Sequence, residues 1–484
     1  MKMLLEPFTR AELEKLDSAT ISVFEKTGIR VLEPEATGLL VDAGAKHDKK
    51  TNVATIPERV VRECLKSAPR KFKLYSRDEK RSLAFGEGKV HFSTIGTAVQ
   101  VEGLDGVVRP ATLKDAEDFF KLSDALPFID HSSWACWPRD TPDFLAPLQE
   151  IFFGFKHSTK TIDGWNWGKA GAEQSLDLAS IVAGGRDELI EKPLLLGFAN
   201  PVSPLTLSKE ATEGLIAYAR NGQPCLYPPE CMAGGTAPAT IAGLLVQQNA
   251  EILVSVVVAQ LVRRGAPSVY SSVSSIMDMR TGSIALGAPE ACLVMAGTAQ
   301  LARFYGLPSR GTGGNTESML VDYQAGAEAA STLLMAALSG FDFVYDAAGS
   351  IESSLTASFT KTVLDNDLCG EVKRILMGVD VSDGAVATDV IDSAALKGAY
   401  LSHPHTLKYF RKEHFSPSLL WRGARTAWTA QPKKDLRERA VVRCQELLRT
   451  HMTDPPLEAD IEKRMLRYIK DVAKRGKPRY ASIA

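Results

Sequence analysis

The chain has 484 residues, and its 57 Lys and Arg nearly balance its 58 Asp and Glu, so the net charge is -1 at neutral pH. Such a chain has no overall field that would attract nucleic acid or an anionic membrane, and no local run of basic residues supplies one. We therefore exclude nucleic acid and membranes as partners, and the length leaves room for one large domain with appendages or for two to three domains.

Two further properties predict a cytoplasmic protein. Charged residues already occur within residues 1–6, before any hydrophobic stretch of signal-peptide length. The most apolar stretch, residues 252–262, is about half as long as a helix needs to be to span a bilayer. The seven cysteines are odd in number and never spaced as CxxC, which indicates reduced thiols and neither a disulfide framework nor a zinc site. We interpret Cys225 and Cys231, the only near pair, as thiols that line a barrel, and we expect no bound metal.

The first 88 residues are dense in charge and differ in pattern from the rest of the chain. They contain helical patterns at residues 10–27 and 57–66, the second with a proline in its first turn. We interpret residues 1–88 as an N-terminal helical cap.

Residues 89–380 alternate between short strand patterns and helical patterns. Eight runs rich in β-branched and aromatic residues recur, and each is followed by glycines, polar residues and an amphipathic stretch. Eight such units predict an α/β fold in which parallel strands close into a (β/α)8 TIM barrel. The competing open, doubly wound sheet would usually carry a GxGxxG fingerprint, which is absent. The runs are residues 90–101, 128–137, 161–167, 194–200, 224–228, 268–275, 307–312 and 341–347.

Residues 381–484 form a C-terminal segment in which this alternation ends. Residues 435–474 have a charged helical pattern, with acidic and basic side chains four residues apart, and the pattern breaks at Pro455 and Pro456. We interpret this helical tail as a solvated appendage or as a contact within a homo-oligomer.

The functional side chains of such barrels come from the C-terminal ends of the strands and from the loops after them. Four of the six tryptophans lie at two neighbouring predicted strand ends. Single tryptophans also fill gaps under loops, but aromatic faces grouped together bind desolvated cations, above all quaternary ammonium groups. We therefore predict a box of aromatic side chains at the barrel mouth. The predicted substrate-binding residues are Thr97, Trp134, Trp165, Trp167, Asn200, Glu230, Arg310 and Tyr345.

Arg310 lies in a glycine-rich turn, residues 308–315, between a predicted strand and helix. Three interpretations are open: a backbone nest for phosphate with Arg310 as counter-ion, a guanidinium clamp for a carboxylate, or an arginine paired with a carboxylate of the barrel itself. No HExxH, GxSxG or Cys/His arrangement is present, so metal-dependent hydrolysis and acyl transfer rank low.

Several separated stretches resemble the trimethylamine methyltransferase family of corrinoid-dependent enzymes. The similarity covers most of the chain, to about residue 425, and the motifs keep their order. They are residues 313–328 (GGNTESMLVDYQAGAE), residues 197–205 (GFANPVSPL), the tract 340–371, His405-Thr406, residues 411–413 and Pro417.

This resemblance implies a barrel whose mouth binds a methylated amine and passes a methyl group from nitrogen to cob(I)alamin. Founding members use pyrrolysine, whereas this chain has none and Met319 stands near that position. The chain is therefore similar to the non-pyrrolysine branch, whose substrates are quaternary amines such as glycine betaine. The resemblance also places Asn200 and Arg310 at the substrate and Tyr345 where the family has a histidine.

The resemblance further implies a cognate corrinoid protein as partner. Chains that hold a corrinoid through a histidine carry DxHxxG, which is absent here, so we expect no permanently bound cofactor. The corrinoid is expected to dock at the mouth through loops and residues 400–421. The residues predicted on the cofactor side are Gly313, Gly314, Met319 and Asp278.

Two alternatives to a methyltransferase are open. A non-catalytic betaine-binding or sensing protein would use the same aromatic box. A barrel lyase or isomerase with a phosphorylated substrate would use residues 311–314 as a phosphate nest, but it would need an acid/base pair that we do not find among Glu230, Asp278 and Asp346. A quaternary ammonium needs no such acid, because its leaving group is a neutral amine.

Overall fold

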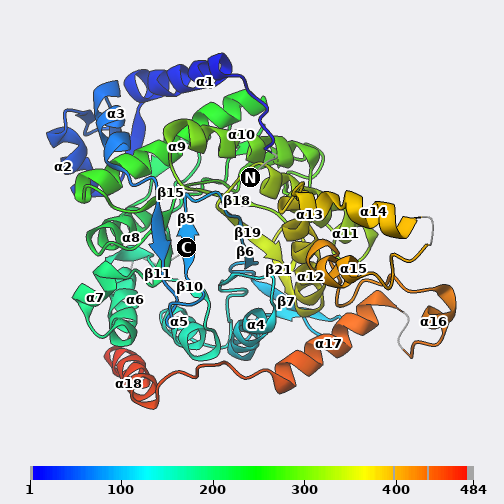
Figure 1. Ribbon diagram of the computed structural model, residues 1–484. Helices are drawn as coiled ribbons and strands as arrows, with labels where there is room; N and C mark the ends of the chain where they lie inside the picture. Colours follow the sequence, from blue (N-terminus) through cyan, green and yellow to red (C-terminus); the bar gives the residue numbers. More distant parts are fainter. Residues whose placement is uncertain (1–3, 396–397, 433–434, 477–484) are drawn as a thin grey trace.

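The computed structural model describes residues 4–395, 398–432 and 435–476, and its centre is a closed barrel of eight parallel strands (Figure 1). Each predicted run contains or overlaps one barrel strand, so the predicted (β/α)8 barrel is confirmed. Pairing of β19 with β6 closes the barrel. The strands are β6 (His91–Thr94), β9 (His131–Ser132), β10 (Thr161–Asp163), β11 (Leu195–Phe198), β13 (Cys225–Leu226), β15 (Ser268–Ser271), β18 (Ser309–Thr312) and β19 (Phe343–Ala348).

Helices surround this barrel (Figure 1). The predicted helix at residues 113–125 coincides with α4, which begins at a capping box between Thr112 and Asp115. Asp322 caps another of the helices in the same way, accepting a hydrogen bond from the backbone N–H of Ala325. The helices are α4 (Leu113–Ala125), α5 (Ala146–His157), α6 (Gly168–Ala183), α7 (Arg186–Glu191), α8 (Lys209–Arg220), α9 (Ile241–Val262), α10 (Pro289–Tyr305), α11 (Tyr323–Leu338) and α12 (Phe359–Leu376).

Helix α9 is the one helix of the described residues that is long and apolar enough, by length and composition, to cross a membrane. It has 22 residues, so the apolar helix is longer than the stretch 252–262 suggested. However, 72% of its most apolar stretch is buried inside the fold. Helices α1 (Arg10–Ser22) and α3 (Glu58–Ser67) pack on it from outside, which makes α9 a core helix.

The N-terminal cap is mixed, because it contains strands as well as the predicted helices. Helix α1 continues as a π-helical stretch, Val23–Thr27, and α2 is Pro34–Asp42. A small sheet in the order β12-β1-β3-β2 joins the cap to a barrel loop, since β12 comes after β11 in the chain. The pattern missed these strands because each has only two or three residues. They are β1 (Ile29–Val31), β2 (Lys46–Asp48), β3 (Val53–Thr55) and β12 (Thr206–Leu207).

A second part of the cap seals one end of the barrel. Strands β4 (Phe72–Leu74) and β5 (Leu83–Phe85) form a hairpin, and β5 lies within the ring of barrel strands in Figure 1. The hairpin's Leu74, Leu83 and Phe85 form one apolar cluster with inward-facing barrel residues such as Leu196 and Phe343. The hairpin therefore closes the barrel floor, at the end opposite the C-terminal ends of the strands.

The C-terminal helices pack along the outside of the barrel (Figure 1). Helix α17 (Leu436–Thr450) lies on α12 and α4, and α18 (Ala459–Arg475) lies on α5 and α6. Each buries an apolar stripe, with Cys444 in α17 and Met465 in α18 completely covered. The tail is therefore not a solvated appendage, although the predicted break at Pro455 and Pro456 is confirmed. Four shorter helices precede it: α13 (Asp383–Val386), α14 (Thr388–Ala394), α15 (Pro404–Glu413) and α16 (Arg425–Thr429).

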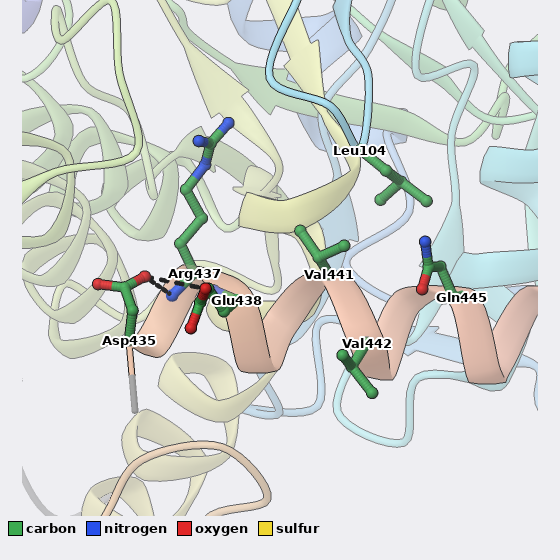
Figure 2. Close-up of a pocket in the computed structure, with 7 residues that line it drawn as sticks. All are labelled: Leu104, Asp435, Arg437, Glu438, Val441, Val442 and Gln445. Carbon is green, nitrogen blue, oxygen red and sulfur yellow. Dashed lines mark hydrogen bonds between the residues drawn. The ribbon is translucent and has the colours of Figure 1, made fainter. Parts of the chain in front are cut away.

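Figure 2 shows how α17 begins. The Asp435 side chain accepts hydrogen bonds from the backbone N–H groups of Arg437 (2.9 Å) and Glu438 (3.3 Å). Arg437 donates to Glu102 at 2.7 Å, which ties α17 to a barrel loop. A hollow of about 510 Å³ lies between this helix and Leu104.

Two small sheets extend the loops beyond the C-terminal ends of the barrel strands. One has the order β20-β21-β7-β8, and the other has the order β14-β16-β17. They hold these loops in place over the barrel. Their strands are β7 (Gln100–Glu102), β8 (Val108–Pro110), β14 (Met232–Ala233), β16 (Ser275–Met277), β17 (Ile284–Ala285), β20 (Ser350–Ile351) and β21 (Thr356–Ser358).

Candidate active site at the barrel mouth

A cavity of about 400 Å³ opens at the C-terminal ends of the barrel strands. The structure brings all eight predicted substrate-binding residues into its wall, and their roles in binding stay predictions. Sequence reasoning missed other lining side chains that also lie after strands and could have been found by the same rule. The predicted residues are Thr97, Trp134, Trp165, Trp167, Asn200, Glu230, Arg310 and Tyr345, and those missed include Asp163, Phe198, Ser353 and Ser354.

One wall of the cavity is built from stacked tryptophans. The rings of Trp134 and Trp165 have centroids 5.6 Å apart and an interplanar angle of 18°. Trp137 packs on Trp165 at 5.3 Å but does not line the cavity. Trp134 is buried, and its Nε1 has no hydrogen-bond partner among the described residues. The wall thus offers flat aromatic faces and one unsatisfied donor.

The cavity floor is formed by two more aromatic rings. Phe198, at the end of β11, meets Tyr345 of β19 edge-on, with centroids 5.2 Å apart. Position 96 requires glycine, because a Cβ atom on Gly96 would lie 2.5 Å from the Tyr345 hydroxyl oxygen. A cation in this cavity would therefore contact aromatic faces on two sides.

Arg310, the second residue of β18, is buried beside these rings. Its Nη1 donates to the backbone oxygen of Ser272 at 2.8 Å, and its Cζ lies 4.7 Å from the centroid of the Tyr345 ring. Asp346 and Glu230 attract the guanidinium electrostatically, but its Nε has no hydrogen-bond partner among the described residues. The interpretation as an arginine paired within the barrel therefore holds only as an electrostatic attraction, and the Nε is open to an anionic ligand.

Besides Asp163, two carboxylic acids with raised pKa values face the same space. Burial raises the pKa of Asp346, and the Arg310 guanidinium opposes that rise. Burial also raises the pKa of Glu230, and the nearby Asp346 adds to the effect. Asp346 is fixed because its Oδ2 accepts from the Thr312 hydroxyl at 2.9 Å. Asp346 and Glu230 thus contribute to the electrostatic potential of the cavity around Arg310.

The backbone around the cavity is strained. Four lining residues that are not glycine have positive φ: Thr97 (54°), Asp346 (61°), Ser353 (49°) and Ser354 (67°). Such conformations cost on the order of 1–3 kcal/mol each and collect at functional sites, where the surrounding fold holds them. The strain therefore marks this cavity independently of its side chains.

The predicted phosphate nest is not available for a ligand. Gly313 N–H donates to the Tyr345 backbone oxygen at 3.1 Å, and Gly314 N–H donates to the Thr332 hydroxyl at 3.1 Å. Gly314 has φ 79°, and a Cβ there would lie 2.6 Å from the Asp346 backbone oxygen. These glycines allow close packing against β19 and do not line the cavity.

The other residues predicted on the cofactor side also lie outside the cavity wall. Met319 is exposed on the loop after β18. Asp278 lies in the turn between β16 and β17, where hydrogen bonds from Arg280 lower its pKa to about 2. Within residues 400–421, Phe415 packs on Phe128, before β9, with ring centroids 5.6 Å apart, whereas Leu420 lines a hollow together with Val321 and Asp322 of the loop after β18. Contact of these residues with a cofactor stays a prediction.

The cysteines lie inside the fold, away from the cavity wall. All seven are free and buried. Cys225 is part of β13, but neither it nor Cys231 lines the cavity, so the interpretation as barrel-lining thiols holds only for the position of Cys225 in a barrel strand. Burial raises the pKa of both thiols, which keeps them protonated and unreactive.

The whole chain matches a known family. The model of the family described as trimethylamine methyltransferase (MTTB) aligns with residues 2–477. The chain belongs to the trimethylamine methyltransferase family. The match includes the N-terminal cap and the C-terminal helices, so both are part of the family fold and not additions to it. The boundaries at residues 88 and 380 stay predictions.

Relatives within the trimethylamine methyltransferase family are similar over nearly their full length. Glycine betaine methyltransferase of Desulfitobacterium hafniense (strain Y51) is 35% identical over 470 residues, covering 97% of each chain. Trimethylamine methyltransferase MttB of Methanosarcina barkeri (strain Fusaro) is 35% identical over 474 residues, covering 95% of this chain and 94% of that one.

A solved structure shares the fold. The Methanosarcina barkeri monomethylamine methyltransferase (MtmB) superposes with a TM-score of 0.54 at 14% identity, covering 92% of this chain and 88% of that chain. At this identity the likeness bears on the barrel fold alone.

Proposed function

We propose that this chain transfers a methyl group from a quaternary amine, glycine betaine or a related betaine, to cob(I)alamin on a separate corrinoid protein, leaving a tertiary amine. Family membership supports the coarser statement, that it is a methyltransferase acting on a methylated amine. The finer statement rests on the cavity.

One observation carries the choice of a betaine. The Nε of Arg310 has no hydrogen-bond partner in the described part of the chain, and Arg310 lines a cavity walled by Trp134 and Trp165. A buried guanidinium of this kind suits a ligand carboxylate, and the aromatic faces suit a quaternary ammonium. A betaine has both groups on one small molecule, and a cavity of about 400 Å³ accommodates it.

The two ends of the ligand make different contributions to catalysis. The positive charge on nitrogen disappears as the methyl group leaves, so contacts with the tryptophans favour the bound substrate over the transition state. The carboxylate keeps its charge throughout, so Arg310 can orient the ligand without that penalty. We infer that the tryptophans hold the spectator methyl groups and leave one methyl group facing the mouth.

The acceptor must approach from outside. The corrinoid supplies the nucleophile, and a cavity of about 400 Å³ is too small to enclose a corrin ring. Loops at the mouth expose apolar side chains, among them Met279, Met319 and Leu355, which supports transient docking of a corrinoid protein there. No acid is required, because the departing amine is neutral. We further infer a cytoplasmic location and a homo-oligomer.

A betaine-sensing protein would use the same cavity, and one assay separates the two functions. The protein is mixed with free cob(I)alamin or a corrinoid protein and with glycine betaine, carnitine, choline or trimethylamine, while the cob(I)alamin absorbance is followed. We expect the absorbance to decay with a carboxylated quaternary amine and to persist with trimethylamine. If the protein binds a betaine but the cob(I)alamin absorbance does not decay with any amine, the protein would be a betaine sensor. The lyase or isomerase is disfavoured, because Gly313 and Gly314 amides are already bonded.

A further inference from the structure

A chain of polar contacts begins at Tyr345 and Asp163, which both line the cavity, and continues into the barrel interior. The Tyr345 hydroxyl donates to Asp163, with 2.5 Å between the two oxygens. Nε2 of His131 lies 2.9 Å from the other oxygen of the same carboxylate, and Nδ1 of His131 lies 2.8 Å from the Thr161 hydroxyl. All four side chains are buried. The contacts reach across the barrel interior, since β19 and β10, which carry Tyr345 and Asp163, are separated in the ring of strands by β6 and β9.

One arrangement of protons satisfies every member of this chain. The Thr161 hydroxyl donates to Nδ1 of His131, Nε2–H donates to Asp163, and Tyr345 donates to the remaining oxygen of that carboxylate. Asp163 then accepts two strong hydrogen bonds as an ion. It is therefore fixed in place from two sides, and it fixes the position of the Tyr345 hydroxyl in turn.

The chain ends at the anion-binding group of the cavity. The guanidinium of Arg310 lies over the face of the Tyr345 ring, with 4.7 Å from Cζ to the centroid. A phenol that donates to a carboxylate gains electron density in its ring, which strengthens the attraction of the ring face for a cation. Ser272 holds the guanidinium from one further side, at Nη1. The orientation of the free Nε therefore depends on where Tyr345 lies.

We propose that Asp163, supported by His131, is a positioning residue for substrate recognition. It holds Tyr345, and Tyr345 holds Arg310 with its unsatisfied Nε turned to the substrate carboxylate. This inference rests on the proposed function, because it requires a carboxylated ligand. Asp163 thereby selects for the carboxylate through Tyr345 and Arg310, although it also lines the cavity, and ligands that lack a carboxylate gain nothing from the arrangement.

Calorimetric titration with two ligands tests the proposal. Glycine betaine carries a carboxylate, and tetramethylammonium has only the cationic group. Tyr345→Phe removes the hydroxyl and keeps the ring, and Asp163→Asn removes the charge. In both variants we expect the ratio of the glycine betaine affinity to the tetramethylammonium affinity to fall about fivefold or more, as for a weakened charged contact.

Two matched variants control for the loss of a buried polar group as such. Tyr270→Phe removes a buried hydroxyl that donates to Asn249 at 2.9 Å. Asp124→Asn alters a buried carboxylate that lies 2.8 Å from Nε2 of His451. Neither Tyr270 nor Asp124 lines the cavity, so the affinity ratio should stay that of the unmodified protein even where thermal stability falls.

Each outcome decides the matter. An unchanged ratio in Tyr345→Phe, or an equal loss for both ligands, would make Asp163 a structural group only and overturn the proposal. If Asp163→Asn does not fold, Tyr345→Phe decides alone. If the unmodified protein binds no carboxylated quaternary amine, neither glycine betaine nor carnitine, the proposed function fails and this inference fails with it. If the affinity ratio falls in Arg310→Ala but not in Tyr345→Phe or Asp163→Asn, the proposed function stands and the positioning role of Asp163 does not.

Discussion

The same barrel strands form the floor of the barrel at one end and its mouth at the other. At the floor, Phe85 of the β4–β5 hairpin packs on Phe343 of β19, with centroids 5.7 Å apart and both rings fully buried. Two residues along the same strand, Tyr345 faces the cavity beside Arg310, whose Nε is unsatisfied among the described residues. Apolar packing completes the floor, whereas the mouth retains free donors and strained backbone. The comparison indicates that this barrel gains stability at one end and keeps binding capacity at the other.

The largest effect is expected at the floor. Phe85→Ala should lower the free energy of unfolding by about 3–5 kcal/mol, because it leaves a cavity under the barrel strands. Denaturant unfolding measures this, with exposed Val107→Ala as a control that should change stability by no more than about 0.5 kcal/mol. Titration below the unfolding transition should still show betaine binding. Loss of binding in the folded variant would mean that the two ends are coupled through β19.

A smaller effect, confined to the mouth, is expected from Arg310→Ala. Its affinity for glycine betaine should fall about tenfold or more, as for loss of a charged hydrogen bond worth about 1.5–3 kcal/mol. Tetramethylammonium should bind nearly as before, because the tryptophans remain. Calorimetry with both ligands measures the difference. Unchanged betaine affinity would contradict the carboxylate clamp and leave the ammonium end as the only anchor.

The smallest effect concerns the pH dependence of stability. Burial raises the pKa of Asp346 in the folded protein above its unfolded value, so the folded state holds this proton more tightly. Stability from this group is greatest below the unfolded pKa and falls as pH rises through the folded one, by about 1.4 kcal/mol for each pH unit that separates the two pKa values. Asp346→Asn should therefore remove a contribution to the unfolding free energy that declines as pH rises above about 4, so that free energy should fall less, or rise more, with pH in the variant. An equal slope in both proteins would contradict a raised pKa.

Much of the barrel and of the cavity wall could be predicted from local sequence patterns. Short β-branched runs predicted each barrel strand, and the rule that functional residues lie at the strand ends selected Arg310, Tyr345 and the tryptophans. The same rule also selected residues that lie outside the cavity wall. Gly314 is one of them, because the backbone turns there and packs against β19. The sequence pattern did not predict the floor hairpin, because its strands have three residues each and lie in a charge-dense segment.

The sequence by itself determined the barrel, its family and the chemical types of the side chains at its mouth, because strand periodicity and the order of motifs are properties of the chain alone. Only the tertiary structure decided that the Nε of Arg310 has no hydrogen-bond partner in the described part of the chain and that Tyr345, Asp163 and His131 form one chain of polar contacts. It also decided that α17 and α18 pack on the barrel. Those facts depend on distances between segments far apart in sequence, which closure of the barrel sets and no local pattern records.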